Sequence, residues 1–154
     1  MFLKEKIGQH IPLKNKSLKN FVLTTFFSVG ITIILSQISE LMTLVFPGLK
    51  FDYTHVSQYP IIVTLICFAI LPAIYEELIF RKFMLQFLRN RLSDLTAILL
   101  TSLLFAVFHM NILQGIIAFI FGIFLSVIAI KTSSILLCIY AHFLNNLFFV
   151  LSLR

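Results

Sequence analysis

Long apolar runs separated by short polar stretches form the main pattern of this chain. The runs cover about residues 21–40, 60–91, 95–110, 115–130 and 135–153. The first is long enough to cross the roughly 30 Å of hydrocarbon in a bilayer as a single helix of about 20 residues. The pattern predicts an all-α fold, a polytopic membrane bundle of about five transmembrane helices.

Proline, glycine and capping residues mark the ends of these runs. Pro47-Gly48 ends the first run, and Ser93-Asp94 supplies an N-cap for the third. Pro72 lies inside the second run and should kink the helix there, because proline removes a backbone hydrogen bond and clashes with the preceding turn. Short turns are predicted at residues 111–114 and 132–134, before the last two helices begin.

Basic residues gather on one side of the predicted membrane. Residues 1–19 hold five lysines and one acid, Glu5, and further cations lie in the later half of the second run and directly after the fourth. Because cytoplasmic loops are enriched in lysine and arginine, this distribution predicts a cytoplasmic N-terminus. We expect a basic cytoplasmic flank over residues 1–20, a first transmembrane helix over 21–47 and a four-helix core over 60–153, in a multi-pass protein of the cell membrane.

The composition agrees with a membrane location. Of the 154 residues, 60% are hydrophobic, 12% are charged and 18 are phenylalanine. A soluble domain of this length could not bury so much apolar surface. The net charge of +6 lies beside the apolar runs, which indicates membrane topology and contact with anionic headgroups instead of nucleic acid. Cys67 and Cys138 lie within apolar runs, so we expect small core residues and no disulfide framework.

A few polar side chains interrupt the apolar runs. Glu76 and Glu77 are two of only six acidic residues in the chain. A charged side chain at the centre of a membrane helix costs about 2.5–3.5 kcal/mol on insertion scales, so such residues usually face a partner or a watery cavity. Apart from hydroxyls and cysteines, the other deep polar residues are Arg81, His109, His142, Asn145 and Asn146.

The spacing of these residues indicates which of them meet. Glu76 lies 17 residues before Ser93, and His109 lies 16 residues after it. If the two helices form an antiparallel hairpin that turns there, both side chains lie about 25 Å from the turn and at the same depth. Glu77 and Arg81 are four residues apart, in the order that favours an ion pair. We interpret them as a structural pair, which leaves Glu76, about 100° away around the helix, free to face a cavity.

The last run adds a second histidine and an amide. His142 and Asn146 are four residues apart and lie on one helix face, and Phe105 has the same spacing to His109, beside which it should form a packing wall. A glutamate with a neutral imidazole can take a proton from water, while a second histidine and an amide can donate hydrogen bonds to an oxyanion. Glu76, His109 and His142 could also bind a divalent metal such as zinc.

Three motifs resemble the signatures of a known family. Glu76-Glu77-Leu-Ile-Phe-Arg81, Phe105-Ala-Val-Phe-His109 and His142-Phe-Leu-Asn-Asn146 resemble, in order, the E-E-x-x-x-R, F-x-x-x-H and H-x-x-x-N patterns of the CPBP family of intramembrane proteases (CAAX protease and bacteriocin-processing, also called Abi). The resemblance covers about residues 60–150. It implies a helical membrane fold with a cavity that opens toward the cytoplasm.

The same resemblance implies a role for each matching residue. Glu76 and His109 would activate water. His142 and Asn146 would stabilise the oxyanion, and Arg81 would pair with the glutamate motif. Members of the family include prenyl-protein endopeptidases and proteins that confer self-immunity to bacteriocins, and both metal-dependent and metal-free mechanisms have been argued for it.

Two functions from different classes follow from these observations. The leading hypothesis is an intramembrane endopeptidase that hydrolyses a peptide bond in a peptide or lipidated protein substrate. The alternative is a non-catalytic membrane protein for bacteriocin self-immunity, since single buried polar residues are more often hydrogen-bond partners between helices. A small transporter would also explain buried Glu and His, but the sequence shows no inverted repeat. The expected partners are the substrate and membrane lipids, with no nucleic acid, and the sequence does not indicate an oligomeric state.

Overall fold

The computed structural model describes residues 17–49 and 53–153, and within these ranges all regular secondary structure is helical. The predicted flank over residues 1–20 therefore lies mostly outside the described residues. The helices are α1 (Leu18–Val45), a 3-10 turn (Pro47–Leu49), α2 (Thr54–Ser57), α3 (Ile61–Thr64), α4 (Leu71–Glu77), α5 (Gln86–Arg89), α6 (Asp94–Phe108), α7 (Ile112–Thr132) and α8 (Ile135–Ser152).

The apolar runs fold as the expected membrane bundle. Four helical segments are long and apolar enough to cross a bilayer, namely Leu18–Val45, Ile61–Arg89, Ile112–Thr132 and Ile135–Ser152. The remaining run forms α6, which has 15 residues and at 1.5 Å per residue is about 22 Å long, shorter than a typical span. The prediction of a polytopic helical membrane protein is confirmed, and α6 is the one predicted span that is shorter than a typical transmembrane helix.

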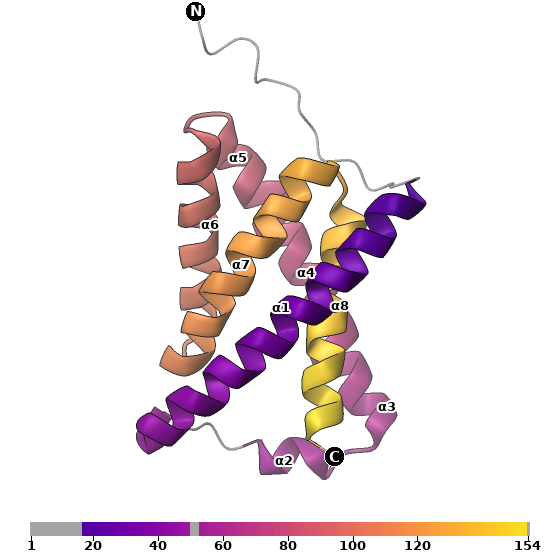
Figure 1. Cartoon of the computed structure of the whole chain (residues 1–154), viewed down its shortest axis with the longest axis vertical. Coiled ribbons are helices and arrows are strands. Elements are labelled where there is room, and N and C mark those ends of the chain that lie inside the picture. The colour runs from indigo at the N-terminus through magenta and orange to yellow at the C-terminus, as the bar shows by residue number, and fades with distance from the viewer. Residues whose placement is uncertain (1–16, 50–52, 154) are drawn as a thin grey trace, which may run out of the picture.

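Four of the cations of the described residues lie at one end of the bundle. Figure 1 shows the N-terminal end of α1, the α5–α6 turn and the α7–α8 turn at the same end. These segments carry Lys19, Arg89, Arg91 and Lys131. This arrangement agrees with the side assigned to the cytoplasm from the charge pattern.

The helix boundaries follow from their caps, with one correction. The hydroxyl of Ser93 accepts a hydrogen bond from the Thr96 amide at 3.2 Å, as expected for the N-cap of α6. The turn predicted over residues 111–114 is wrong, because α7 already begins at Ile112. Asn111 acts as its N-cap and accepts a hydrogen bond from the Gln114 amide at 2.9 Å, while Met110, with φ of 52°, reverses the chain.

The helix that contains Pro72 continues through this residue. A π-helical stretch, Leu65–Ile70, comes directly before α4, and Pro72 occupies the first turn of α4. Within a continuous helix a proline lacks one backbone donor and its ring crowds the preceding turn, and here the π-helical stretch occupies that preceding turn. The structure thus places a change in helical hydrogen bonding, from π to α, where the sequence predicted a kink.

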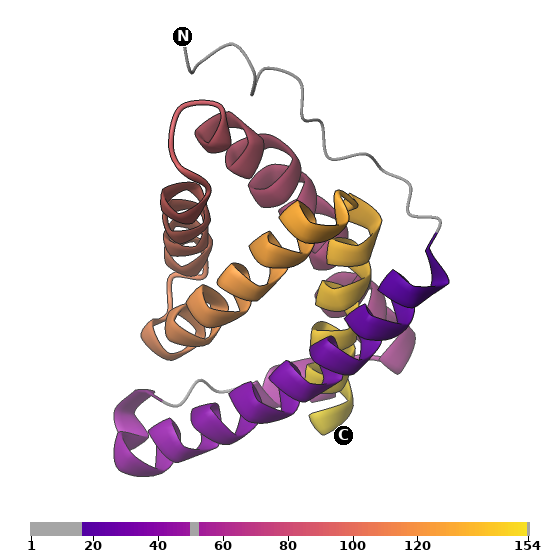
Figure 2. The same ribbon diagram turned by 45° about the horizontal axis from the view of Figure 1, so that its top comes forward.

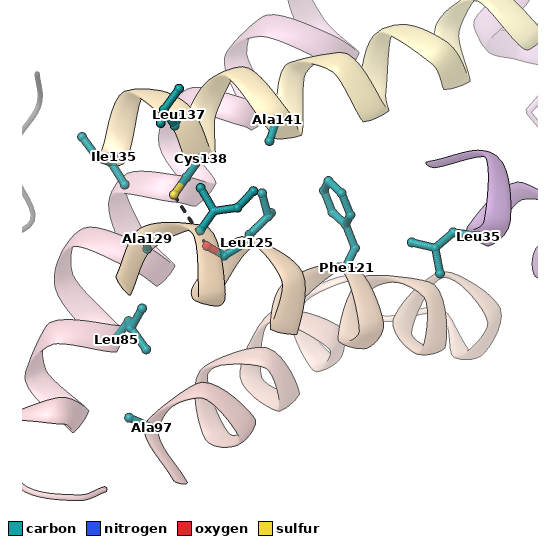
Figure 3. Packing of buried hydrophobic residues seen from close by; sticks show 11 residues of the cluster. Leu35, Leu85, Ala97, Phe121, Leu125, Ala129, Ile135, Leu137, Cys138 and Ala141 are labelled. Carbon is teal, nitrogen blue, oxygen red and sulfur yellow. Dashed lines mark hydrogen bonds between the residues drawn. The ribbon is translucent and has the colours of Figure 1, made fainter. Parts of the chain in front are cut away.

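The apolar core is built mainly from α7 and α8, with contributions from neighbouring helices. Figure 3 shows Phe121, Leu125 and Ala129 facing Ile135, Cys138 and Ala141. The thiol of Cys138 donates to the Leu125 carbonyl at 3.6 Å, so this cysteine is a core residue as predicted. Cys67 is exposed on the surface of the bundle, and its prediction as a core residue is wrong.

The first helix lies across the outside of this core. Figures 1 and 2 both show α1 crossing α8. Its buried positions, Thr24, Ser28, Thr32 and Leu35, recur at intervals of three and four residues and so form one face. Small and hydroxyl-bearing residues allow membrane helices to approach closely and to exchange hydrogen bonds.

Candidate active site

A buried ion pair joins two adjacent helical stretches. Glu77 ends α4, and Arg81 lies in the π-helical stretch Leu78–Leu85 that follows. One guanidinium nitrogen of Arg81, Nη1, donates to Glu77 Oε1 at 2.9 Å, and both side chains are 0% exposed. The other, Nη2, donates to the Gly122 carbonyl on α7 at 3.2 Å. The expected ion pair is therefore present, and it also ties these stretches to α7.

An interruption in α-helical hydrogen bonding coincides with this polar segment. The π-helical stretch begins at Leu78, immediately after the two glutamates, and contains Arg81. Both Glu76 and Glu77 are buried although they are consecutive residues. Helical π-turns are rare and are found frequently at functional sites.

His142 connects the two glutamates from a different helix. Its Nδ1 lies 2.9 Å from Glu77 Oε1, and its Nε2 lies 3.8 Å from Glu76 Oε2. An ionised carboxylate can only accept, so Nδ1 donates its proton to Glu77. The imidazole of His142 makes edge-to-face contacts with Phe105 and Phe121, whose ring centroids lie 5.8 and 5.7 Å from its own. The histidine is thus held in one orientation, with Nε2 toward Glu76.

His109 is oriented by the end of α6. Its backbone N–H bonds to the Ala106 carbonyl, in a tighter turn than the α-helix, which leaves the Phe105 carbonyl without its usual amide partner. The ring Nδ1 of His109 takes that place at 2.8 Å. Because a carbonyl can only accept, Nδ1 carries the proton, and Nε2 of the neutral ring holds a free lone pair.

Phe105 is the residue around which these groups are arranged. Its ring packs edge-to-face against His109, at 4.8 Å between centroids, and against His142. The Arg81 guanidinium carbon lies 4.4 Å from the Phe105 centroid, a separation typical of a cation–π contact. Phe105 therefore serves as the predicted wall beside His109 and as a wall for His142 as well.

The two asparagines of α8 are linked to each other and to α1. The Asn145 side-chain amide donates to Asn146 Oδ1 at 3.4 Å, and the Thr32 hydroxyl donates to Asn145 Oδ1 at 3.1 Å. Both asparagines are half-buried, whereas Thr32 is buried. Oδ1 of Asn146 thus accepts a hydrogen bond from Asn145, while no hydrogen bond within the described chain uses Nδ2 of Asn146.

Some of the predicted site residues contact one another directly, and others are connected only through a third residue. Glu76, Glu77, Arg81 and His142 form one buried cluster. Within the described part of the chain, no hydrogen bond or ion pair joins Glu76 to His109 or His142 to Asn146. His109 is connected to the cluster through Phe105.

The buried cluster retains polar atoms that no protein group satisfies. Glu76 Oε2, Glu77 Oε2 and Arg81 Nε are buried and lack a hydrogen-bond partner among the described residues. Two carboxylates and one guanidinium leave one negative charge in a low-dielectric setting, where uncompensated charge is costly. Unsatisfied carboxylate and guanidinium atoms of this kind can form hydrogen bonds to a water molecule or a substrate group.

The predicted metal ligands do not form a ready metal site. Among residues 17–49 and 53–153, no three His, Cys, Asp or Glu side chains are grouped so that they could hold a metal ion. Glu76, His109 and His142 are therefore not assembled as zinc ligands in the described chain.

Sequence reasoning missed two contacts of this site. It treated Glu77 only as the partner of Arg81, whereas Glu77 also holds His142, which lies 65 residues away in the chain. It also gave no role to Thr32, the partner of Asn145 on α1. The regular spacing of Thr24, Ser28 and Thr32 is the one sequence signal that could have indicated a polar face on the first helix.

One comparison with known proteins gave a match. Residues 57–148, more than half of the chain, match a protein-family model described as "Type II CAAX prenyl endopeptidase Rce1-like". The matched range includes all three motifs of the site and excludes α1. Neither the curated proteins nor the solved structures gave a match.

Proposed function

The chain belongs to this Rce1-like family of type II CAAX prenyl endopeptidases, and from that premise we propose that it hydrolyses a peptide bond in a peptide or lipidated protein substrate with Glu76, His109, His142 and Asn146. The observation that carries the proposal is Glu76 Oε2, a buried atom without a hydrogen-bond partner in the described chain, 3.8 Å from His142 Nε2. A buried carboxylate oxygen of this kind can still accept a hydrogen bond from a water molecule or a substrate group.

In the proposed reaction, Glu76 and His109 act on the water molecule. Both offer an acceptor, since Glu76 has a free carboxylate oxygen and the neutral ring of His109 has a lone pair on Nε2. Glu76 takes a proton from water as the water oxygen bonds to the carbonyl carbon, while His109 orients the water. The same proton then passes to the leaving amine as the C–N bond breaks.

His142 and Asn146 stabilise the negative charge that develops on the carbonyl oxygen. With Nδ1 donated to Glu77, His142 becomes a donor at Nε2 once it is protonated. Two carboxylates face this ring, Glu77 at 2.9 Å from Nδ1 and Glu76 at 3.8 Å from Nε2. Asn146 contributes the N–H groups of its amide. In a dry site each such donor is worth about 3–4 kcal/mol of transition-state stabilisation.

The surrounding segments have supporting roles in this proposal. Glu77 and Arg81 orient His142 and are not expected to contact the substrate. Residues 60–153 are the catalytic core, and the first helix, over 21–47, supports it from outside. The proposed location is the cell membrane, with the substrate approaching from the lipid or the cytoplasmic face.

The test compares Glu76→Gln and His109→Ala with the unaltered chain in proteoliposomes that contain a farnesylated CAAX peptide. Both variants are expected to lose cleavage by about a hundredfold or more. Glu40→Gln is the matched control, because Glu40 is an exposed carboxylate on α1 and the same charge is removed. Cleavage at the unaltered rate by both site variants would refute the proposal.

A further inference from the structure

A contact between α1 and α8 reaches the proposed oxyanion donor. The Thr32 side chain is buried on α1, and its hydroxyl donates to Asn145 Oδ1 at 3.1 Å. Asn145 immediately precedes Asn146 on α8. Because α1 lies outside the residues that match the family model, this contact is a feature of the present chain that family membership does not supply.

The direction of each hydrogen bond determines how the amides are turned. Asn145 accepts from Thr32 through Oδ1, so its Nδ2 is the end that faces Asn146. That nitrogen can only donate, and the atom that receives it at 3.4 Å is Asn146 Oδ1. Oδ1 of Asn146 is therefore held toward Asn145. Nδ2 of Asn146 lies on the other side of the same amide, away from Asn145, and can donate there.

We propose that Thr32 and Asn145 are positioning residues that fix the orientation of the Asn146 amide as an oxyanion donor. The inference rests on the proposed function, in which Asn146 stabilises the oxyanion. An amide turned the other way would present Oδ1 to the developing negative charge, and two lone pairs would repel each other where a donor is needed. A preorganised donor avoids this reorientation during the reaction.

A purely structural contact predicts a different outcome. Hydrogen bonds between membrane helices often serve only to hold the helices together. The chain offers a matched control for that role, since Thr25 and Tyr140 share a hydrogen bond of 3.1 Å between the same two helices. Thr25→Val removes that bond without touching either asparagine.

The experiment measures kcat and KM for the full chain in proteoliposomes, with a farnesylated CAAX peptide as substrate. Thr32→Val keeps the shape of the side chain and removes the hydroxyl, and Asn145→Ala removes the amide. We expect each to lower kcat by about tenfold with little change in KM, because the donor is misoriented and not lost. Thr32→Ser should restore kcat, and Thr25→Val should leave it unchanged.

A double substitution separates this inference from the proposed function. In an Asn146→Ala background, Thr32→Val should cause no further loss of kcat, since the residue that it orients is gone. If Asn146→Ala itself retains full activity, the proposed oxyanion role is wrong. If Asn146→Ala is impaired while Thr32→Val and Asn145→Ala match Thr25→Val in both kcat and thermal stability, only the positioning role is overturned. A loss of stability without a change in kcat would also overturn it.

Discussion

Arg81→Met should destabilise the protein strongly, because it removes one partner of a fully buried ion pair. The Arg81 and Glu77 atoms lie 2.9 Å apart and both side chains are 0% exposed. At an effective dielectric constant of about 20, two unit charges at that distance attract by roughly 5–6 kcal/mol. The contact of Glu77 with His142 Nδ1, at 2.9 Å, remains in this variant and offsets part of the loss. We therefore expect a loss of about 3–5 kcal/mol in the free energy of unfolding, as found when buried pairs are broken.

The decisive comparison is the double variant Glu77→Gln/Arg81→Met. Removing both charges leaves no buried ion without a counter-ion, and the amide oxygen introduced by Glu77→Gln would still accept from His142. The double variant should therefore be more stable than the sum of the two single losses predicts, by at least about 2 kcal/mol. Because the chain has no tryptophan, unfolding is best followed by far-UV circular dichroism in detergent titrated with SDS.

A matched control distinguishes loss of the pair from loss of an arginine. Arg91 is exposed and stacks 3.8 Å above the Phe87 ring, so Arg91→Met makes the same chemical change outside the bundle. Arg91→Met should lower the free energy of unfolding by less than about 1 kcal/mol. If Arg81→Met and Arg91→Met are equally mild, or if the two site substitutions are strictly additive, the buried pair does not have the energetic role assigned to it.

Three further predictions test the packing and the surface. Gly122→Ala should lower the free energy of unfolding by about 1–3 kcal/mol, because its Cβ would lie 3.2 Å from atoms of Ser102 and Phe105, whereas Gly30→Ala, with nothing within 4 Å, should not. Phe105→Ala should reduce cleavage more than Gly122→Ala does at equal residual stability, since its ring contacts both histidines. Burial raises the pKa of Tyr53 above 10.0, so stability should fall as pH rises above that value, and Tyr53→Phe should remove this fall in alkaline unfolding titrations.

Hydropathy and capping chemistry were sufficient for most of the fold. The apolar runs correspond to the observed helices because a backbone in lipid must satisfy its own hydrogen bonds, and a helix does so locally. Ser93 indicated the start of α6 because its hydroxyl can accept a hydrogen bond from a backbone amide of the first helical turn, a contact between residues close in the sequence. The turn after α6 was misplaced because Asn111 can either cap a helix or remain in a loop. Only the chain reversal at Met110 decides between them.

The candidate site was predictable to the extent that its contacts lie within one helix. The Glu77–Arg81 pair follows from spacing alone. The contact of Glu77 with His142 depends on how α4 and α8 are rotated about their axes, and no local pattern encodes that rotation. Glu76 and His109 are a similar case, because equal height in the membrane does not specify the lateral distance between two side chains.

The position of His142 changes how the two glutamates should be understood. Sequence spacing suggested that Glu77 pairs with Arg81 and leaves Glu76 free to face a cavity. In the structure, one imidazole faces both carboxylates through its two nitrogens. Glu77 Oε1 is shared between Arg81 Nη1 and His142 Nδ1, each at 2.9 Å, and the other ring nitrogen of His142 lies 3.8 Å from Glu76 Oε2. Glu77 thus couples the charge of Arg81 to the orientation of His142. The ion pair within the bundle therefore also fixes which ring nitrogen of His142 faces Glu76.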